Sequence, residues 1–533
     1  MPEQKHQKDD ARFFDTVIYN ARIVCGDNKP DFYGMVGIVG EKIEYSGTEI
    51  PFHAVNKIDA KGMVLSPGFI DIHGHSDFSI LVYPEAESKL FQGVTTEVTG
   101  NCGLSAAPLY AQAYDRWKSR WSKKGLDIDW NHPADYFYRL VNAKPSINIV
   151  PLLGHTNLRT WINGYSGSSL DDNQIRKLKY YAMEMMDEGF WGVSFGLEYP
   201  PGIFADDREL DAIAGVLCER SGFIGVHMRN EGEQLLESVE QILTISSKFE
   251  VPLQISHLKT CGRKNWYKID GVLSKIERVS EIYHGINFDR YPYTALNTDL
   301  DWIIPQQIFD GGISNALNRL KDRNIKSEYA RYLANSYTIE DSKNIIISAI
   351  REDKKELLGK RISDFIDVND IKFWEKFIEF LIEIEFDAEA SFDFMDESNL
   401  RKILVHDLCM VASDSSVRSF NDGGNPHPRV YSTFIKFIQM IMKENFLPLY
   451  TAIYKITGLP AKKIGLAGRG MIKRDYFADL VLFNPGKIQD RATFDQPKIK
   501  PLGIEYLWVN GKNIIKDGIM ISSGSGKLLL KGK

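Results

Sequence analysis

The chain has 533 residues, of which 43% are hydrophobic and 26% charged, and its formal net charge is −6. This length predicts a barrel-sized domain together with a smaller module rather than one ordinary domain. The mild negative charge excludes a basic nucleic-acid-binding or membrane-surface footprint, so we expect neither nucleic acid nor membrane as a partner.

Five cysteines are scattered along the chain without a Cys-x-x-Cys motif, which favours a reducing compartment over a disulfide framework. Residues 1–12 form a polar tail that lacks the apolar segment of a secretory signal. No stretch approaches the roughly 18 apolar residues that a membrane helix requires. We therefore expect a cytoplasmic protein.

Residues 13–66 have the pattern of part of a small β-sandwich. Short strand-like runs separated by glycines lie at 15–20, 22–24, 35–39 and 42–46. These strands alone cannot cover both faces of a sheet, so they need a partner segment. Strand character returns at 478–483 and 503–511, and we expect residues 466–525 to complete the sandwich from the other terminus.

Residues 67–465 alternate strands with helices, which predicts an α/β fold with parallel strand pairing. The expected strands are Phe69–His73, Thr95–Thr99, Ile147–Leu153, Trp191–Leu197, Phe223–Met228, Pro252–His257, Ile286–Tyr293 and Met410–Ser413. The clearest helix, at 171–188, carries one apolar stripe and is followed by Gly189. Eight such strands predict a TIM-like (β/α)8 barrel.

One connection in this barrel is far too long for a loop. Residues 300–400 are rich in helix formers and charge, and a structureless segment of that length is improbable in a compact domain. We expect a helical insertion on the C-terminal face of the barrel. It could act as a lid, or it could be a packing elaboration without a part in catalysis.

Metal-ligand side chains recur at the ends of the predicted strands. His73 and His75 end the first strand, and their spacing places both imidazoles on one face. Cys102 follows the second strand, and the fifth, sixth and eighth strands end in His227, His257 and Asp414. Barrel active sites lie at this end of the strands, and Zn²⁺ binds Cys, His and carboxylate together. The pattern predicts a metal-dependent enzyme with a mononuclear or dinuclear zinc site.

Each of these residues also has a purely structural interpretation. Cys102 could be a small buried side chain, and Asp414 could cap a helix, although beside a metal it is better placed as a general base. Glu198, after the fourth strand, could simply accept hydrogen bonds from its own loop. His155, after the third strand, is a weaker candidate that we expect beside the metal ligands.

Several longer motifs carry a resemblance to a known family. They are 67–77 (Pro-Gly-Phe-Ile-Asp-Ile-His-Gly-His-Ser-Asp), 93–103 with Gly-Asn-Cys-Gly, 154–155, 196–202, 227–231, 256–259, 291–293, 413–414, 427–429 (His-Pro-Arg) and 478–485. With them the sequence resembles the amidohydrolase superfamily, specifically its N-acyl-D-amino-acid deacylase (D-aminoacylase) branch. The resemblance covers nearly all of the chain outside the insertion.

The resemblance implies a role for each matching residue. It implies a tight Zn²⁺ at Cys102, His227 and His257, and a second, weaker site at His73, His75 and Asp414. It implies that Lys259, Tyr291 and Arg429 hold the substrate carboxylate.

The sequence also departs from the family pattern in two places. The lysine that bridges two metals in many amidohydrolases is missing after the fourth strand, where only Glu198 is found. The small Gly-Ser pair that follows Tyr-Pro-Tyr in the family is Leu296-Asn297 here. These departures bear on the identity of the substrate more than on the type of reaction.

The resulting expectation is zinc-dependent hydrolysis of an N-acyl-D-amino acid, a small-molecule substrate, to a carboxylate and a free D-amino acid. Asp414 would take a proton from water and return it to the leaving amine. The alternatives on the same fold are a cyclic-amide hydrolase of the hydantoinase or dihydroorotase kind and a D-peptidase. An inactive amidohydrolase-like scaffold is a further alternative, which the complete set of ligand-type residues disfavours.

Overall fold

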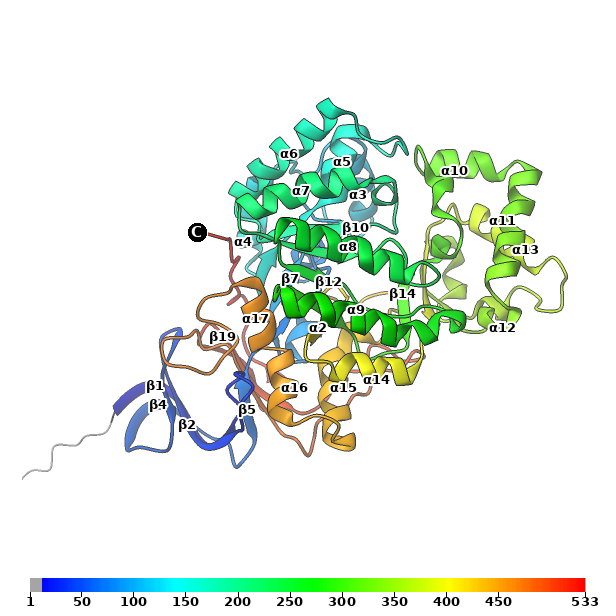
Figure 1. Ribbon diagram of the computed structural model, residues 1–533. Coiled ribbons are helices and arrows are strands. Elements are labelled where there is room, and N and C mark those ends of the chain that lie inside the picture. Colours follow the sequence, from blue (N-terminus) through cyan, green and yellow to red (C-terminus); the bar gives the residue numbers. More distant parts are fainter. Residues whose placement is uncertain (1–11, 533) are drawn as a thin grey trace, which may run out of the picture.

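The computed structural model describes residues 12–532, so nearly all of the polar tail expected at 1–12 lies outside the described residues. Its centre is a ring of parallel strands surrounded by helices (Figure 1). The strands are β6 (Phe69–Asp71), β7 (Val94–Thr99), β8 (Asn148–Pro151), β9 (Leu153–Gly154), β10 (Gly192–Gly196), β11 (Phe223–His227), β12 (Leu253–Ile255), β13 (Ile286–Arg290) and β17 (Cys409–Val411).

These strands form two arcs of one barrel. One arc has the order β6-β7-β8 and the other the order β17-β13-β12-β11-β10-β9, and β8 and β9 are two parts of one interrupted strand. A parallel bridge between Gly74 and Ser415 joins the ends of the first and last strands. Every residue of these strands is buried, as expected for parallel strands covered on both faces. The predicted (β/α)8 barrel is thus confirmed.

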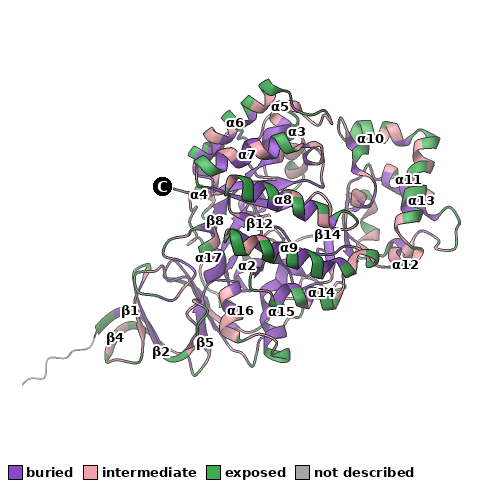
Figure 2. Cartoon of the chain, in the orientation of Figure 1, coloured by how far each residue is buried: buried purple, intermediate pink, exposed green. Residues whose placement is uncertain are grey.

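Helices cover the outside of the barrel and turn their polar faces to solvent (Figure 2). They include α6 (Asp172–Asp187), α7 (Asp207–Glu219), α8 (Leu235–Phe249), α9 (Ile269–Ile282), α14 (Glu397–Val405) and α15 (Arg429–Glu444). In α6, Asp171 and Gln174 form a capping box at the start, and Leu178, Ala182 and Met185 are buried. The i, i+4, i+7 spacing of this stripe turns one face of the helix to the strands.

Strands from both ends of the chain form one nine-stranded sheet below the barrel (Figure 1). Its members are β1 (Arg12–Ile23), β2 (Phe32–Val39), β3 (Lys42–Gly47), β4 (Phe52–Asp59), β5 (Val64–Pro67), β18 (Leu480–Phe483), β19 (Ile504–Val509), β20 (Lys512–Lys516) and β21 (Ile519–Met520). The two terminal segments join where β5 pairs with β18 in antiparallel register. The expected module built from both termini is therefore present, whereas the division of the chain at 66 and 466 stays a prediction.

The insertion contains more than the helices expected from the sequence. Besides α10 (Ile313–Leu320), α11 (Arg323–Ser336), α12 (Ile339–Ser342) and α13 (Phe373–Glu383), it holds an antiparallel sheet. This sheet has the order β14 (Ala295–Asp299), β16 (Ala388–Asp393) and β15 (Ile345–Ile350). The strands are short and lie among helix-rich segments, so their β-branched and aromatic residues gave too weak a signal. The expected helices of the insertion are present, and the sheet is an addition that the sequence analysis did not predict.

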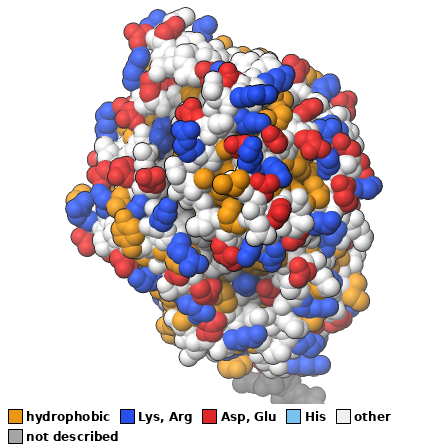
Figure 3. Space-filling model, turned by 90° about the vertical axis from the view of Figure 1, so that its right-hand side faces the viewer, with side chains coloured by type: hydrophobic (Ala, Val, Ile, Leu, Met, Phe, Trp, Pro, Cys, Tyr) orange, Lys and Arg blue, Asp and Glu red, His pale blue; other side chains and the backbone are white. Residues whose placement is uncertain are grey.

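The insertion packs around a hydrophobic core of its own, which includes Phe377, Leu381 and Phe392. It projects to one side of the barrel, and acidic and basic side chains are interspersed on its outer face (Figure 3). Within residues 12–532, no helix is long and apolar enough to cross a membrane.

Candidate metal centre

The six predicted metal ligands gather at the C-terminal end of the barrel, in two groups that share Cys102. One group contains His73, His75, Cys102 and Asp414, and the other contains Cys102, His227 and His257. The ligand atoms of each group lie within 4.8 Å of one another. Cys102 Sγ lies 3.3 Å from His73 Nε2 and 3.6 Å from His257 Nε2. The fold therefore brings strand ends that are far apart in the sequence into one cluster.

The backbone at the cluster is bent to aim these side chains inward. Cys102, His257 and Asp414 have φ angles of 51°, 36° and 48°. Residues other than glycine rarely adopt this left-handed conformation, and such strain is concentrated at functional sites. Gly74 lies between the two histidines, where a Cβ atom would come within 1.9 Å of Glu97 Oε1. Close packing against Glu97 thus requires glycine between the two histidines.

Asp414 lies between the two histidines of the first strand and a buried arginine. Its Oδ1 is 3.1 Å from His75 Nε2, and its Oδ2 is 3.0 Å from Arg429 Nη1. Burial disfavours the carboxylate, but Arg429 and the nearby histidines outweigh burial and hold the pKa of Asp414 well below its usual value. In the described chain the next helix is α15, which starts at Arg429, so Asp414 caps no helix.

The electrostatics of the cluster favour a thiolate. Burial raises the pKa of Cys102, but His73 and the hydrogen bonds from His227 and His257 lower it well below the usual value of a thiol. Burial disfavours protonated His227, whereas Glu231 and Cys102 favour it and raise its pKa to about 10. The pocket thus brings anionic groups next to imidazoles. In such a setting a bound metal cation takes the place of the protons on these groups.

The donor set fits a zinc ion. One thiolate, two or more imidazoles and a carboxylate are the ligand types that Zn²⁺ selects, and three protein ligands leave a coordination position open. His227 Nε2 lies 2.9 Å from Glu198 Oε2, while its Nδ1 is buried without a hydrogen-bond partner within residues 12–532. A buried imidazole nitrogen without a hydrogen-bond partner is free to bind a metal ion.

Two carboxylates that the sequence analysis did not single out contact the predicted metal ligands His73 and His257. Asp289 Oδ1 lies 3.1 Å from His73 Nδ1 and accepts a hydrogen bond from the backbone N–H of His257. Glu231 lies 2.9 Å from His257 Nδ1 and 2.5 Å from Lys259 Nζ. Such partners fix the orientation of metal-binding imidazoles. The sequence signal was an acidic residue inside or just after a buried strand, without a partner nearby in the chain.

The predicted carboxylate-binding residues adjoin the cluster and already have partners. Lys259 pairs with Glu231 and lies 2.7 Å from His257 Nδ1. Arg429 pairs with Asp414, and its guanidinium lies over the Tyr291 ring at 4.7 Å. The Tyr291 hydroxyl is buried and lacks a hydrogen-bond partner within residues 12–532.

The two weaker candidates have different positions. Glu198 belongs to a third group of possible ligand atoms, together with His227 and Glu231. His155 lies apart, because its Nε2 is 3.2 Å from Glu209, which also pairs with the buried Arg159. His155 is therefore a member of a separate buried ion cluster and not a ligand in the groups described above.

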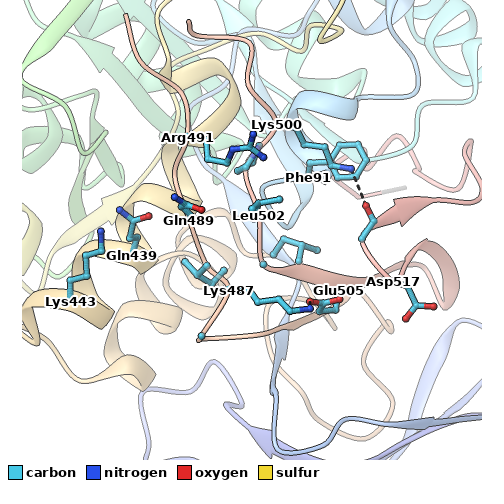
Figure 4. A pocket seen from close by; sticks show the side chains of 16 residues that line it. Phe91, Gln439, Lys443, Lys487, Gln489, Arg491, Lys500, Leu502, Glu505 and Asp517 are labelled. Carbon is cyan, nitrogen blue, oxygen red and sulfur yellow. Dashed lines mark hydrogen bonds and ion pairs between the residues drawn. The ribbon is translucent and has the colours of Figure 1, made fainter.

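A cavity of about 680 Å³ lies away from this cluster, between α15 and the chain around β19 (Figure 4). Its lining includes Phe91, Lys443, Arg491 and Lys500. Lys500 Nζ donates to the carbonyl of Gly518 at 2.9 Å and lies over the Phe91 ring. None of the predicted site residues lines this cavity.

Comparisons with known proteins place the chain among amidohydrolases. Residues 57–159 and 398–515 match the Amidohydrolase family. The chain is 29% identical over 523 residues to a D-aminoacylase of Alcaligenes xylosoxydans xylosoxydans, with 98% of this chain and 99% of the relative covered. It is 30% identical over 502 residues to an N-acyl-D-aspartate deacylase of the same organism, with 94% and 92% covered.

A solved structure is similar over the same extent. The N-acyl-D-glutamate deacylase of Bordetella bronchiseptica, solved with zinc and a phosphonate inhibitor that mimics the tetrahedral intermediate, superposes with a TM-score of 0.82 at 27% identity. The match covers 97% of this chain and 100% of that structure.

Proposed function

We propose, from the premise that this chain belongs to the N-acyl-D-amino-acid deacylase family of the amidohydrolase superfamily, that it is a zinc-dependent hydrolase of N-acyl-D-amino acids. The reaction cleaves a linear C–N amide bond and yields a carboxylate and a free D-amino acid. The observation that carries the proposal is the convergence of Cys102, His227 and His257 with His73, His75 and Asp414 at the barrel mouth.

In this proposal Cys102, His227 and His257 hold one tightly bound zinc ion. His73, His75 and Asp414 form a second, weaker site. When bound, zinc supplies Lewis-acid activation of the amide carbonyl and of water. Glu231 and Asp289 keep His257 and His73 in the orientation that binding requires, through the contacts at 2.9 and 3.1 Å.

Asp414 is the proton carrier. It is ionised next to Arg429, so it has a lone pair available for the proton of the attacking water. The leaving nitrogen of an amide needs a proton to depart as an amine, and the same carboxyl group can return it. Asp414 acts at this position because the Ser413–Asp414 turn is tied to the first strand by the hydrogen bond from Asp414 N–H to the His73 carbonyl, at 2.8 Å.

Lys259, Arg429 and Tyr291 bind the free carboxylate of the substrate. Lys259 and Arg429 each contact a member of the cluster, His257 and Asp414, and the Arg429 guanidinium lies over the Tyr291 ring. Arg429 also donates to the carbonyl of Asn297 at 3.2 Å, which ties the insertion to the carboxylate site. The side chains of Leu296 and Asn297 replace the smaller pair of the family, so we expect them to shape the pocket for the amino-acid side chain.

A substrate panel tests the proposed function. Purified, zinc-loaded protein is assayed with N-acetyl-D-amino acids of varied side chain, with their L enantiomers, and with hydantoins as cyclic amides. We expect turnover of at least one N-acetyl-D-amino acid and a preference of about 100-fold or more over its L enantiomer, as a site with several directional contacts provides. Turnover of hydantoins alone would assign the chain to the cyclic-amide hydrolases instead.

A further inference from the structure

Arg290, the last residue of β13, is a buried cation without an acidic partner. Its side chain is 1% exposed, and none of the acidic residues within 12–532 forms an ion pair with it. Nη2 donates to the Tyr293 carbonyl at 2.7 Å and contacts Met395 Sδ, while Nε and Nη1 have no hydrogen-bond partner in the described part of the chain. Burying an unpaired charge is costly, so this arrangement requires an explanation.

Arg290 borders the predicted carboxylate site. Its guanidinium lies 4.2 Å from the centre of the Tyr291 ring, and the Arg429 guanidinium lies 4.7 Å from the same centre. Two guanidinium groups therefore contact the ring of Tyr291, whose hydroxyl is buried.

Of the three buried cations Lys259, Arg290 and Arg429, two have an acidic partner within residues 12–532. Glu231 pairs with Lys259, and Asp414 pairs with Arg429, each within 3.0 Å. Among the residues that the structure describes, no acidic side chain pairs with Arg290 in the same way. One carboxylate brought in by a ligand would balance the group, and the Tyr291 hydroxyl next to Arg290 still needs a hydrogen-bond partner.

We propose that Arg290 is a positioning residue for recognition of the substrate carboxylate: it holds the Tyr291 ring in place and supplies the unbalanced positive charge that makes the site select substrates with a free carboxylate. The inference rests on the proposed function, because it concerns the same site. Arg290 acts by positioning Tyr291 and through the electrostatic attraction of its positive charge for the carboxylate, without touching the substrate. An apolar residue of similar size would hold the Tyr291–Tyr293 turn with less desolvation cost, so a purely structural role leaves the charge unexplained.

The test compares a free-acid substrate with its neutral analogue. KM and kcat are measured for the best N-acetyl-D-amino acid and for the corresponding carboxamide, in the wild-type protein and in Arg290→Gln. We expect the KM of the free acid to rise about tenfold or more in Arg290→Gln, with kcat changed less than about threefold. The kinetic constants for the carboxamide should change less than about twofold, so selectivity for the free acid falls.

Two further variants separate charge from packing. Arg290→Lys keeps the charge, so it should retain the selectivity of the wild type within about threefold. Arg469→Gln alters another buried arginine, which pairs with Asp479 far from the metal ligands, and should change stability without changing selectivity. If Arg290→Gln does not fold, the result for Arg290→Lys decides alone.

The inference is overturned if folded Arg290→Gln keeps the selectivity of the wild type, or if folded Arg290→Lys loses it. Failure of the proposed function gives a different result, because the wild-type protein would then hydrolyse neither substrate. In that case direct binding of the N-acetyl-D-amino acid, measured by calorimetry on wild type and Arg290→Gln, still tests Arg290. Equal affinity of the two proteins would contradict the inference.

Discussion

The backbone conformation and the ionisation of Asp414 are both set by the residues around it. It is held in a left-handed backbone conformation, ionised by Arg429, and within 3.1 Å of His75. Asparagine has the same shape but cannot accept a proton.

We therefore predict that Asp414→Asn lowers kcat by about 10²-fold or more, the typical cost of removing a general acid–base group. KM should not rise, because the proposed function assigns binding of the carboxylate to Lys259 and Arg429 and not to Asp414. Steady-state kinetics on protein with measured zinc content checks this prediction. Near wild-type kcat in a folded, zinc-loaded Asp414→Asn protein would refute the role of Asp414 as proton carrier.

A second prediction at this scale concerns Glu231, which joins His257 to Lys259. Glu231→Gln keeps the volume but removes the negative charge that compensates the two neighbours. Zinc affinity should fall about 10- to 100-fold, the usual effect of losing the partner of a metal-binding imidazole. Competition with a chelator measures this affinity, and Glu233→Gln, at an exposed position two residues later, is the matched control. Equal zinc affinity in both variants would contradict the role given to Glu231.

At the scale of the elements, the joint between the first and last barrel strands contains a buried lysine. Lys89 Nζ lies 2.7 Å from Asp71 Oδ2, 2.8 Å from Ser413 Oγ and 3.0 Å from the Ser415 carbonyl, and Glu97 is 3.6 Å away. It links β6, β7 and the turn that carries Asp414.

Removal of this lysine leaves two buried carboxylates without a cation. We predict that Lys89→Met lowers the free energy of unfolding by about 3–5 kcal/mol, as expected for breaking a buried ion pair on one side. The exposed Lys177→Met on α6 should change it by less than about 0.5 kcal/mol. Urea unfolding of both variants measures the difference, and equal stabilities would show that the joint does not depend on Lys89.

The elements also show what the sequence could and could not reveal. The eight barrel strands were predictable because each is an apolar run buried on both faces, and the clustering of the proposed metal ligands was predictable because each ends or follows such a run. The strand β4 was missed because most of its residues are partly or fully exposed, which weakens the apolar signal.

Residues whose partners are distant in the sequence were also missed. Asp289 contacts His73, which lies 216 residues earlier in the chain, so local pattern gives no sign of the contact. The unpaired state of Arg290 likewise becomes visible only when every neighbour is in place.

At the scale of the whole molecule, the sheet module and the barrel depend on each other. The β5–β18 pairing connects residues 64–67 with 480–483, and β5 leads directly into the first barrel strand. Farther along, Trp191 Nε1 donates to the Leu529 carbonyl at 2.7 Å, so the end of the chain also packs against the barrel.

We predict that a chain truncated after residue 465 does not form a stable barrel, because β5 keeps β1 but loses β18 on its other edge, and the buried faces of both parts become exposed. Circular dichroism and thermal unfolding of the truncated protein test this prediction. A cooperative unfolding transition together with retained hydrolase activity would show that the barrel is independent of the C-terminal strands.

The central claim is that hydrolysis depends on a zinc ion held by Cys102, the residue that both ligand groups share. The most direct measurement determines zinc content and turnover of an N-acetyl-D-amino acid together, in the wild type and in Cys102→Ala. We predict about one tightly held zinc per wild-type chain, and loss of both zinc and activity in the variant. Full zinc content or wild-type turnover in folded Cys102→Ala would contradict the account.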